Sequence, residues 1–144
     1  MATRPLHAGY FPTRATAPIA ANTLIERGML VQVNASGLAV PGAAGNGFIT
    51  IGVAKHTVDN RTGSALGGAA SAADVECDCG IVGLTQTTTG FLPGDLAYVA
   101  GPYTVTETES TNGFAGVVHE VRDGAVWIWS CAPIAGLLRL ASVP

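Results

Sequence analysis

Charged side chains are scarce in this sequence. Only 12% of its 144 residues are Asp, Glu, Lys or Arg, against roughly 25% in typical soluble domains, and Lys55 is its single lysine. The mean hydropathy of +0.38 agrees with this scarcity. Two kinds of protein fit such a surface: a β-protein coated with Thr, Ser and Gly that stands alone, or a chain that is partly covered in an assembly.

Basic clusters and long apolar runs are also missing. The formal net charge is -3 and no Lys/Arg-rich run occurs, so the counterion release that drives nucleic-acid binding is weak. No segment approaches the roughly 20 consecutive apolar residues that cross a bilayer, and residues 1–18 lack the apolar core of a signal peptide. We therefore expect no nucleic-acid partner and no membrane partner, and we expect the chain to stay in the compartment where it is made.

Catalytic and metal-binding motifs are absent from the sequence as well. Its three cysteines cannot all pair within one chain, and without an export signal we expect reduced thiols and no structural disulfide. The three histidines are scattered, neither G-x-S-x-G nor H-E-x-x-H occurs, and the "GAAGNG" loop lacks the Lys-Ser/Thr of a phosphate-binding loop. The sequence therefore predicts no catalytic residue, no metal site, no cofactor and no enzyme; a hydrolase would need a site assembled from distant loops.

Short β-patterns separated by turn residues fill the chain from Gly28 to about residue 131. They read "MLVQV", "LAV", "FITIGVA", "DVECDCGIVGL", "DLAYVA", "YTVTETE", "AGVVHEV" and "AVWIWS". Asp123-Gly124, between the last two, indicates a tight hairpin because both residues tolerate positive φ. We predict an all-β fold over residues 24–131, a small β-barrel or β-sandwich of short antiparallel strands.

The two ends of the chain differ from this β-domain. Residues 1–23 contain three prolines and no acidic residue, so we predict an extended N-terminal arm that is either disordered or ordered on a partner. Its candidate contact residues for another subunit are Arg4, Pro5, Tyr10, Phe11 and Arg14. The leucine-rich residues 132–144 are predicted to form a C-terminal tail that docks on its own or a neighbouring subunit.

The segment "DVECDCG" at residues 74–80 alternates carboxylates with thiols. On a strand, Asp74, Glu76 and Asp78 would form an acidic stripe on one face, while Val75, Cys77 and Cys79 would share the other. Core packing of the thiols is favoured over metal binding, because no C-x-x-C or H-x-x-x-H spacing supplies further ligands. The stripe is either simply solvated or a docking surface for arginines, such as Arg4 and Arg14 of a neighbouring subunit's arm.

Two tryptophans are the other candidate site. Trp127 and Trp129 fall on one face of a predicted strand. Packing in the core or at a subunit interface is favoured for them over a ligand-stacking platform.

A weak internal repeat appears when the chain is compared with itself at an offset of 66 residues. Gly28, Leu30 and Val33 then match Gly94, Leu96 and Val99, and Asn46-Gly47-Phe48 matches Asn112-Gly113-Phe114. The shared order of turn, strand and turn suggests two related β-units, over residues 28–54 and 94–118.

The phrases "RGMLVQVNASGLAVPGAAGNGFITIGVAKHTV", "VECDCGIVGL", "FLPGDLAYVA" and "GVVHEV" carry a resemblance over about residues 26–130. In this order they resemble the small capsid decoration (cement) proteins of tailed bacteriophages. Two cysteines stand where that family usually has small aliphatic residues, and the long arm with its prolines fits the family.

The resemblance implies a structural virion protein on the outer surface of the phage head, made and assembled in the host cytoplasm. Its partners would be the major capsid protein and itself, as a homotrimer, and it would stabilise the shell by bridging capsid subunits. Two alternatives stay open: a head-fibre or tail attachment domain, and a carbohydrate-binding β-module that uses Trp127, Trp129 and Tyr103.

Overall fold

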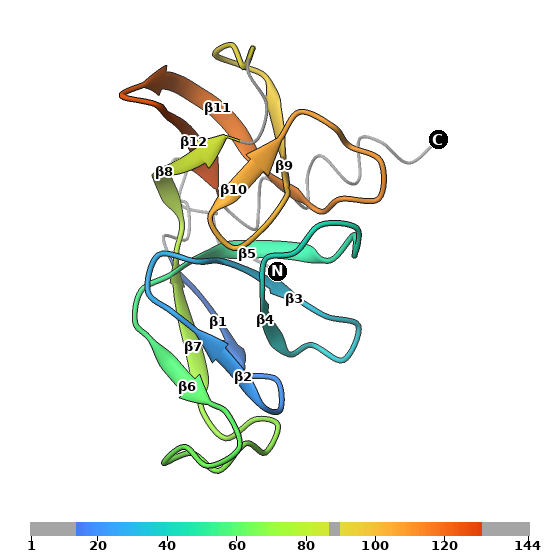
Figure 1. Cartoon of the computed structure of the whole chain (residues 1–144), viewed down its shortest axis with the longest axis vertical. Coiled ribbons are helices and arrows are strands. Elements are labelled where there is room, and N and C mark those ends of the chain that lie inside the picture. The colour runs from blue at the N-terminus through green and yellow to red at the C-terminus, as the bar shows by residue number, and fades with distance from the viewer. Residues whose placement is uncertain (1–13, 87–89, 131–144) are drawn as a thin grey trace, which may run out of the picture.

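The computed structural model describes residues 14–86 and 90–130 of the chain, and these are all-β, as predicted (Figure 1). The strands in chain order are β1 (Arg14–Pro18), β2 (Thr23–Ile25), β3 (Leu30–Val33), β4 (Ala39–Pro41), β5 (Ile49–Ala54), β6 (Val58–Asn60), β7 (Asp74–Asp78), β8 (Gly80–Gln86), β9 (Leu96–Val99), β10 (Thr104–Thr106), β11 (Phe114–Arg122) and β12 (Ala125–Ser130). The described residues form no helix long and apolar enough to cross a membrane.

The strands divide into two units that lie one above the other along the long axis of the molecule (Figure 1). The first unit, residues 14–78, is a five-stranded sheet in the order β1-β7-β5-β3-β4, with β2 and β6 paired beside it. A parallel bridge between Ile19 and Ala39 links its two outer strands, so the sheet nearly closes on itself. The second unit, residues 80–130, is a closed barrel in the order β10-β8-β12-β11-β9.

The two units have the same topology. In chain order, β1, β3, β4, β5 and β7 of the first unit correspond to β8, β9, β10, β11 and β12 of the second, and corresponding strands have the same neighbours. The barrel is closed by parallel pairing of β10 with β8, which corresponds to the parallel Ile19–Ala39 bridge. The chain is therefore built from two copies of one five-stranded β-unit.

The residue pairing agrees between the two copies. Arg14 lies opposite Asp78 as Ile81 lies opposite Trp129, and Ala17 lies opposite Val75 as Leu84 lies opposite Val126. The hydrogen bonds of the turns also repeat, since Met29 N–H donates to Glu26 C=O at 3.1 Å and Asp95 N–H donates to Leu92 C=O at 3.0 Å. Gly28 and Gly94, which precede these two strands, both have a φ of 93°.

A β-bulge sits at the same place in each unit. Val31 pairs with Gly52, and Ala97 pairs with Gly116, and beside each of these pairs the register shifts by one residue. By this register Phe114 corresponds to Thr50 rather than to Phe48. The repeat is thus present, but the two Asn-Gly-Phe triplets matched in sequence do not coincide in the fold.

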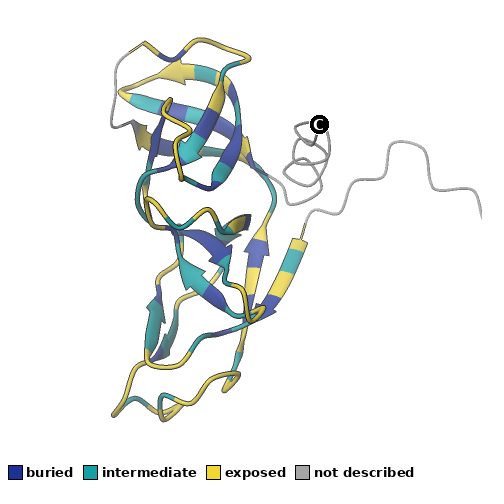
Figure 2. Ribbon diagram, turned by 90° about the vertical axis from the view of Figure 1, so that its right-hand side faces the viewer, coloured by how far each residue is buried: buried dark blue, intermediate teal, exposed yellow. Residues whose placement is uncertain are grey.

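Each unit has its own apolar core, filled from corresponding positions. The first core contains Ala17, Ile25, Val31, Ala39, Ile51, Ala54, Val75 and Cys77; the second contains Leu84, Phe91, Ala97, Val105, Ala115, Val118, Val126 and Ile128 in the same order. Figure 2 shows how buried and exposed residues alternate along the strands that supply them. The alternation follows from the two-residue period of a β-strand, which sends one side chain inward and the next outward.

Contacts between the units come from the outward face of β3 and β5. Leu30 is fully buried and belongs to the core cluster of the second unit, against which Val53 also packs. Leu30 N–H donates to the carbonyl of Pro102 at 2.7 Å, and Gly45 N–H donates to Asn112 Oδ1 at 2.8 Å. The two units therefore share buried surface.

Two boundaries predicted from the sequence are wrong. Residues 14–23 belong to the first unit rather than to a free arm, because Ala15 and Ala17 of β1 face the core and Arg14 and Thr16 face outward. Small alanines gave this alternation little hydropathy contrast, and Pro18 is tolerated because β1 is an edge strand. The single strand predicted over "DVECDCGIVGL" is two strands, and the chain passes between the units at Cys79.

Candidate functional site

The acidic stripe and the tryptophan pair occupy the same place in the two units. β7 corresponds to β12, and their matched pairings place Glu76 at the position of Trp127 and Asp78 at the position of Trp129. All four side chains point outward from their unit; the alternation in the sequence predicted that each pair shares a face, but not that the tryptophans face away from the core. The two candidate sites looked unrelated in the sequence, but they occupy equivalent surfaces of the two units. The surface is acidic in the first unit and aromatic in the second.

In the first unit, the outward residues opposite one another across four strands are Arg14, Asp78, Val53 and Leu30. We call this set the mixed row. Arg14 and Asp78 are exposed and stand directly opposite each other on β1 and β7, so opposite charges are neighbours there. Arg14, expected on another subunit, therefore lies beside the acidic stripe of its own chain.

In the second unit, the corresponding residues are Ile81, Trp129, Val117 and Leu96, which we call the apolar row. Ile81 is 49% exposed, Trp129 51% and Leu96 40%, while Val117 is partly buried. Four large apolar side chains thus cross four strands of the closed barrel on its outer surface. An exposed apolar band of this kind is typical of a protein interaction surface.

Trp127 is held beside this row by its neighbours. Its indole ring covers Gly83, where an added Cβ would lie 3.1 Å from the ring, and the Arg122 guanidinium lies 4.4 Å from the ring centroid. Arg122 is in turn paired with Glu120, 3.2 Å away. Trp127 is consequently packed on the outside of the barrel, and only Trp129 offers a free aromatic surface.

The acidic stripe is solvated, and a histidine lies near its central residue. Asp74, Glu76 and Asp78 are all exposed, and His56 Nε2 lies 4.0 Å from Glu76 Oε2. Arg4, Pro5, Tyr10 and Phe11 of the predicted arm lie outside the described residues, as does the predicted tail 132–144. The pairing of the arm with the stripe stays a prediction.

The two described cysteines are both free thiols in different environments. Cys77 is fully buried, and burial is the main cause that raises its pKa to about 12. Cys79 lies between β7 and β8, outside both strands, and its thiol donates to Ile51 C=O at 3.5 Å. The prediction that Cys79 shares the core face with Cys77 is wrong, because the chain leaves the first unit at this point. The described part of the chain holds no group of three or more His, Cys, Asp and Glu residues that could bind a metal.

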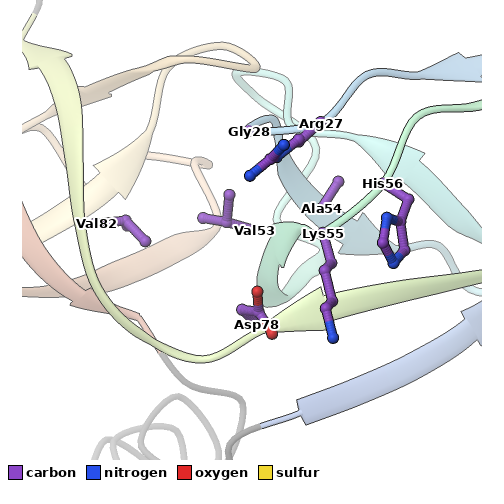
Figure 3. Close-up of a pocket in the computed structure, with 8 residues that line it drawn as sticks. All are labelled: Arg27, Gly28, Val53, Ala54, Lys55, His56, Asp78 and Val82. Atoms are coloured by element: carbon purple, nitrogen blue, oxygen red, sulfur yellow. The ribbon is translucent and has the colours of Figure 1, made fainter.

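An open cavity of about 360 Å³ lies where the two units meet. Figure 3 shows Val53 and Val82 at its apolar side and the polar ends of Arg27, Lys55, His56 and Asp78 around it. Asp78 offsets only part of the positive charge of Arg27 and Lys55. The cavity lies beside the place where Leu30 and Val53 of the mixed row pack on the barrel core.

Tyr103 is placed by the contact between the units, not with the tryptophans. Its hydroxyl donates to Glu26 Oε2 at 3.3 Å, and burial followed by the charge of Glu26 raises its pKa. Tyr103 and Trp129 are both partly exposed, but no contact in the described residues joins Tyr103 to either tryptophan in one sugar-stacking surface.

Comparison with known proteins found no matching protein family, no matching curated protein and no matching solved structure. The candidate site consequently rests on the geometry of the two rows. Sequence reasoning missed Ile81, Val117 and Leu96, although all three sit at outward positions of predicted strands. The signal that could have found them is the unit repeat, because it aligns them with Arg14, Val53 and Leu30.

Proposed function

We propose that this protein is a structural virion protein of the capsid decoration type, which binds the outer surface of a phage head and bridges major capsid subunits. Support comes from the resemblance in sequence and from a surface that offers broad, exposed strand faces. The apolar row and the exposed residues of the mixed row, Arg14 and Asp78, also give one chain two contact surfaces of different chemistry. A protein that holds two neighbours at once gains strength from avidity.

The observation that carries the proposal is the position of β1. Among the described strands β1 forms a ladder with β7 alone, and its other side meets β4 only through the Ile19–Ala39 bridge just after its last residue, so the edge around Arg14, where residues 1–13 lead into the strand, pairs with no described strand. An arm that continues an edge strand is well placed for strand addition to a partner sheet. The acidic stripe lies on the adjacent strand, so arm and stripe form one continuous candidate surface for the capsid.

The test is quantitative mass spectrometry of particles purified from the source of the sequence. Near-equal copies of this chain and of the major shell protein are expected for a decoration protein. A few copies per particle would favour a head-fibre or tail attachment domain instead, and absence from particles would overturn the proposal.

The arm is tested by rebinding to stripped particles. Deletion of residues 1–13 should abolish or strongly weaken co-sedimentation with the particles while the described β-units keep their melting transition.

The acidic stripe is tested by a triple variant that carries Asp74→Asn, Glu76→Gln and Asp78→Asn, with Glu107→Gln as a comparison substitution on the second unit. Unchanged binding after the deletion would remove the arm from the mechanism, and binding to a glycan array that is lost in Trp129→Ser would favour the carbohydrate-binding alternative.

A further inference from the structure

Corresponding leucines in the two units differ sharply in exposure. Leu30 of β3 is 0% exposed because the second unit covers it, whereas Leu96 of β9 is 40% exposed. In a two-fold arrangement of the units, both leucines would be covered alike. The contact between the units is therefore head-to-tail, and a head-to-tail contact leaves an unused copy of each of its two surfaces at the ends.

The second unit covers Leu30 with its barrel core, and the turn between β9 and β10 borders this contact. Pro102 C=O in this turn accepts the Leu30 N–H at 2.7 Å, and a Cβ on nearby Gly42 would lie 3.0 Å from a Val99 methyl and 3.1 Å from Gly101 C=O. The approach is close, so the turn fits against the first unit without room for another side chain.

The corresponding turn of the first unit is free. It joins β3 to β4, and its hydrogen bond from Asn34 N–H to Leu38 C=O matches the one from Ala100 N–H to Thr104 C=O in the second unit. Its tip, residues 35–37, is exposed and reads Ala-Ser-Gly, without a charge. A small, neutral tip of this kind is suited to an apolar partner surface.

We propose that Leu96 and Val117 of the apolar row of one chain are covered by the tip at residues 35–37 of a second copy of the same chain, repeating the contact that the second unit makes with Leu30 and Val53. The occupant is a second copy because the surface known to cover these two row positions is another unit of the same kind. The margin of this surface is also more apolar than in the contact between the units, since Ile81 and Trp129 stand where Arg14 and Asp78 remain exposed. Contacts of this type close into rings when the rotation allows it.

This inference rests on the proposed function and adds to it a contact between copies of the chain, which the homotrimer implied by the sequence resemblance would need. It is tested on the purified full-length chain without any capsid, so it can fail while capsid binding stands, and capsid binding can fail while it stands. The measurement is sedimentation velocity over a wide range of concentrations. Wild-type protein is expected to form species heavier than the 14.5 kDa chain.

Two blocking variants test the two surfaces separately. Leu96→Glu places a charge at the row position that corresponds to the covered Leu30, and Ser36→Arg places a bulky charge at the tip; each is expected to lose self-association and remain at 14.5 kDa. Val121→Glu is the matched control, because Val121 is 41% exposed on β11 but lies outside the row, and it should associate like the wild type. Melting curves establish that each variant is folded.

The decisive step is to mix the two blocked variants. One free row and one free tip remain in each pair, so the mixture should form heterodimers and nothing larger. No heterodimer would mean that the contact is not head-to-tail and would overturn the inference, as would a monomeric wild type. If deletion of residues 131–144 converts such a monomer into an oligomer, the chain's own tail covers the row instead, which also overturns it.

Discussion

Cys77 is packed in the core of the first unit like a small apolar side chain, and its thiol is not exposed for reaction. It lies opposite Ala15 on β1 and Ala54 on β5, within the core of the first unit. Burial raises its pKa to about 12, with smaller contributions from Cys79 and Asp78. The thiolate is the nucleophile that attacks a thiol reagent, so Cys77 should be inert while the unit is folded.

Labelling with a thiol reagent checks this in a Cys131→Ser background. At pH 8 we expect Cys79 to be modified in the native protein, and Cys77 only after unfolding. The unfolded thiol has its usual pKa of 9.0 and the folded one a pKa of about 12, so its contribution to stability is fully present below pH 9 and is lost as pH rises from 9 to 12. A Cys77→Ala variant should lack this part of the alkaline loss. Rapid native labelling of Cys77 would contradict the burial.

At the scale of elements, the two β-bulges require glycine because there is no room for a Cβ at Gly52 or Gly116. A Cβ on Gly52 would lie 2.6 Å from Asp78 C=O, and a Cβ on Gly116 would collide with Trp129 C=O. The obstacle is backbone of the neighbouring strand in both cases, so it cannot turn aside as a side chain would. Because these glycines have no Cβ, the last strand of each unit can lie close to the bulged strand. This close approach places Asp78 or Trp129 in its row.

Gly116→Ala is therefore expected to lower the free energy of unfolding by about 1–3 kcal/mol, as overpacking does. Gly101→Ala is the matched control, since its Cβ would meet only the Thr104 hydroxyl, 2.8 Å away, and that side chain can rotate. Denaturant titrations give both values. Equal stability of the two variants would mean that β12 can shift to admit the methyl group.

The sequence predicted single elements better than their relationship. Strand alternation identified which acids and which tryptophans share a strand face, and Asp123-Gly124 forms the predicted tight turn between β11 and β12. The repeat was visible only around β3 and β9, because the offset changes along the chain: 66 residues from Leu30 to Leu96, 64 from Val53 to Val117 and 51 from Asp78 to Trp129. Connections of unequal length, including β6 and the loop before β7, conceal the duplication from any single offset.

At the scale of the whole molecule, the two cores are coupled through Leu30 and Val53. These residues are on strands of the first unit but pack into the core of the second. A closed barrel of this size has a small core of its own, so the borrowed leucine matters to its stability. The second unit is thus completed by the first, and the two should unfold together.

Site-specific probes can follow each unit separately in one experiment. Both tryptophans are in β12 of the second unit, and Cys77 is in the first. Tryptophan fluorescence and Cys77 labelling should therefore report the same denaturant midpoint.

Leu30→Ala should move both midpoints by the same amount, corresponding to a loss of about 2–5 kcal/mol in the free energy of unfolding, because it opens a cavity in the shared core. Its structural counterpart Leu96→Ala should cost less than about 1 kcal/mol, because Leu96 is half-exposed. If fluorescence changes before the thiol becomes reactive, the units unfold independently, and the contact at Leu30 is then too weak to serve as the pattern for contact between chains.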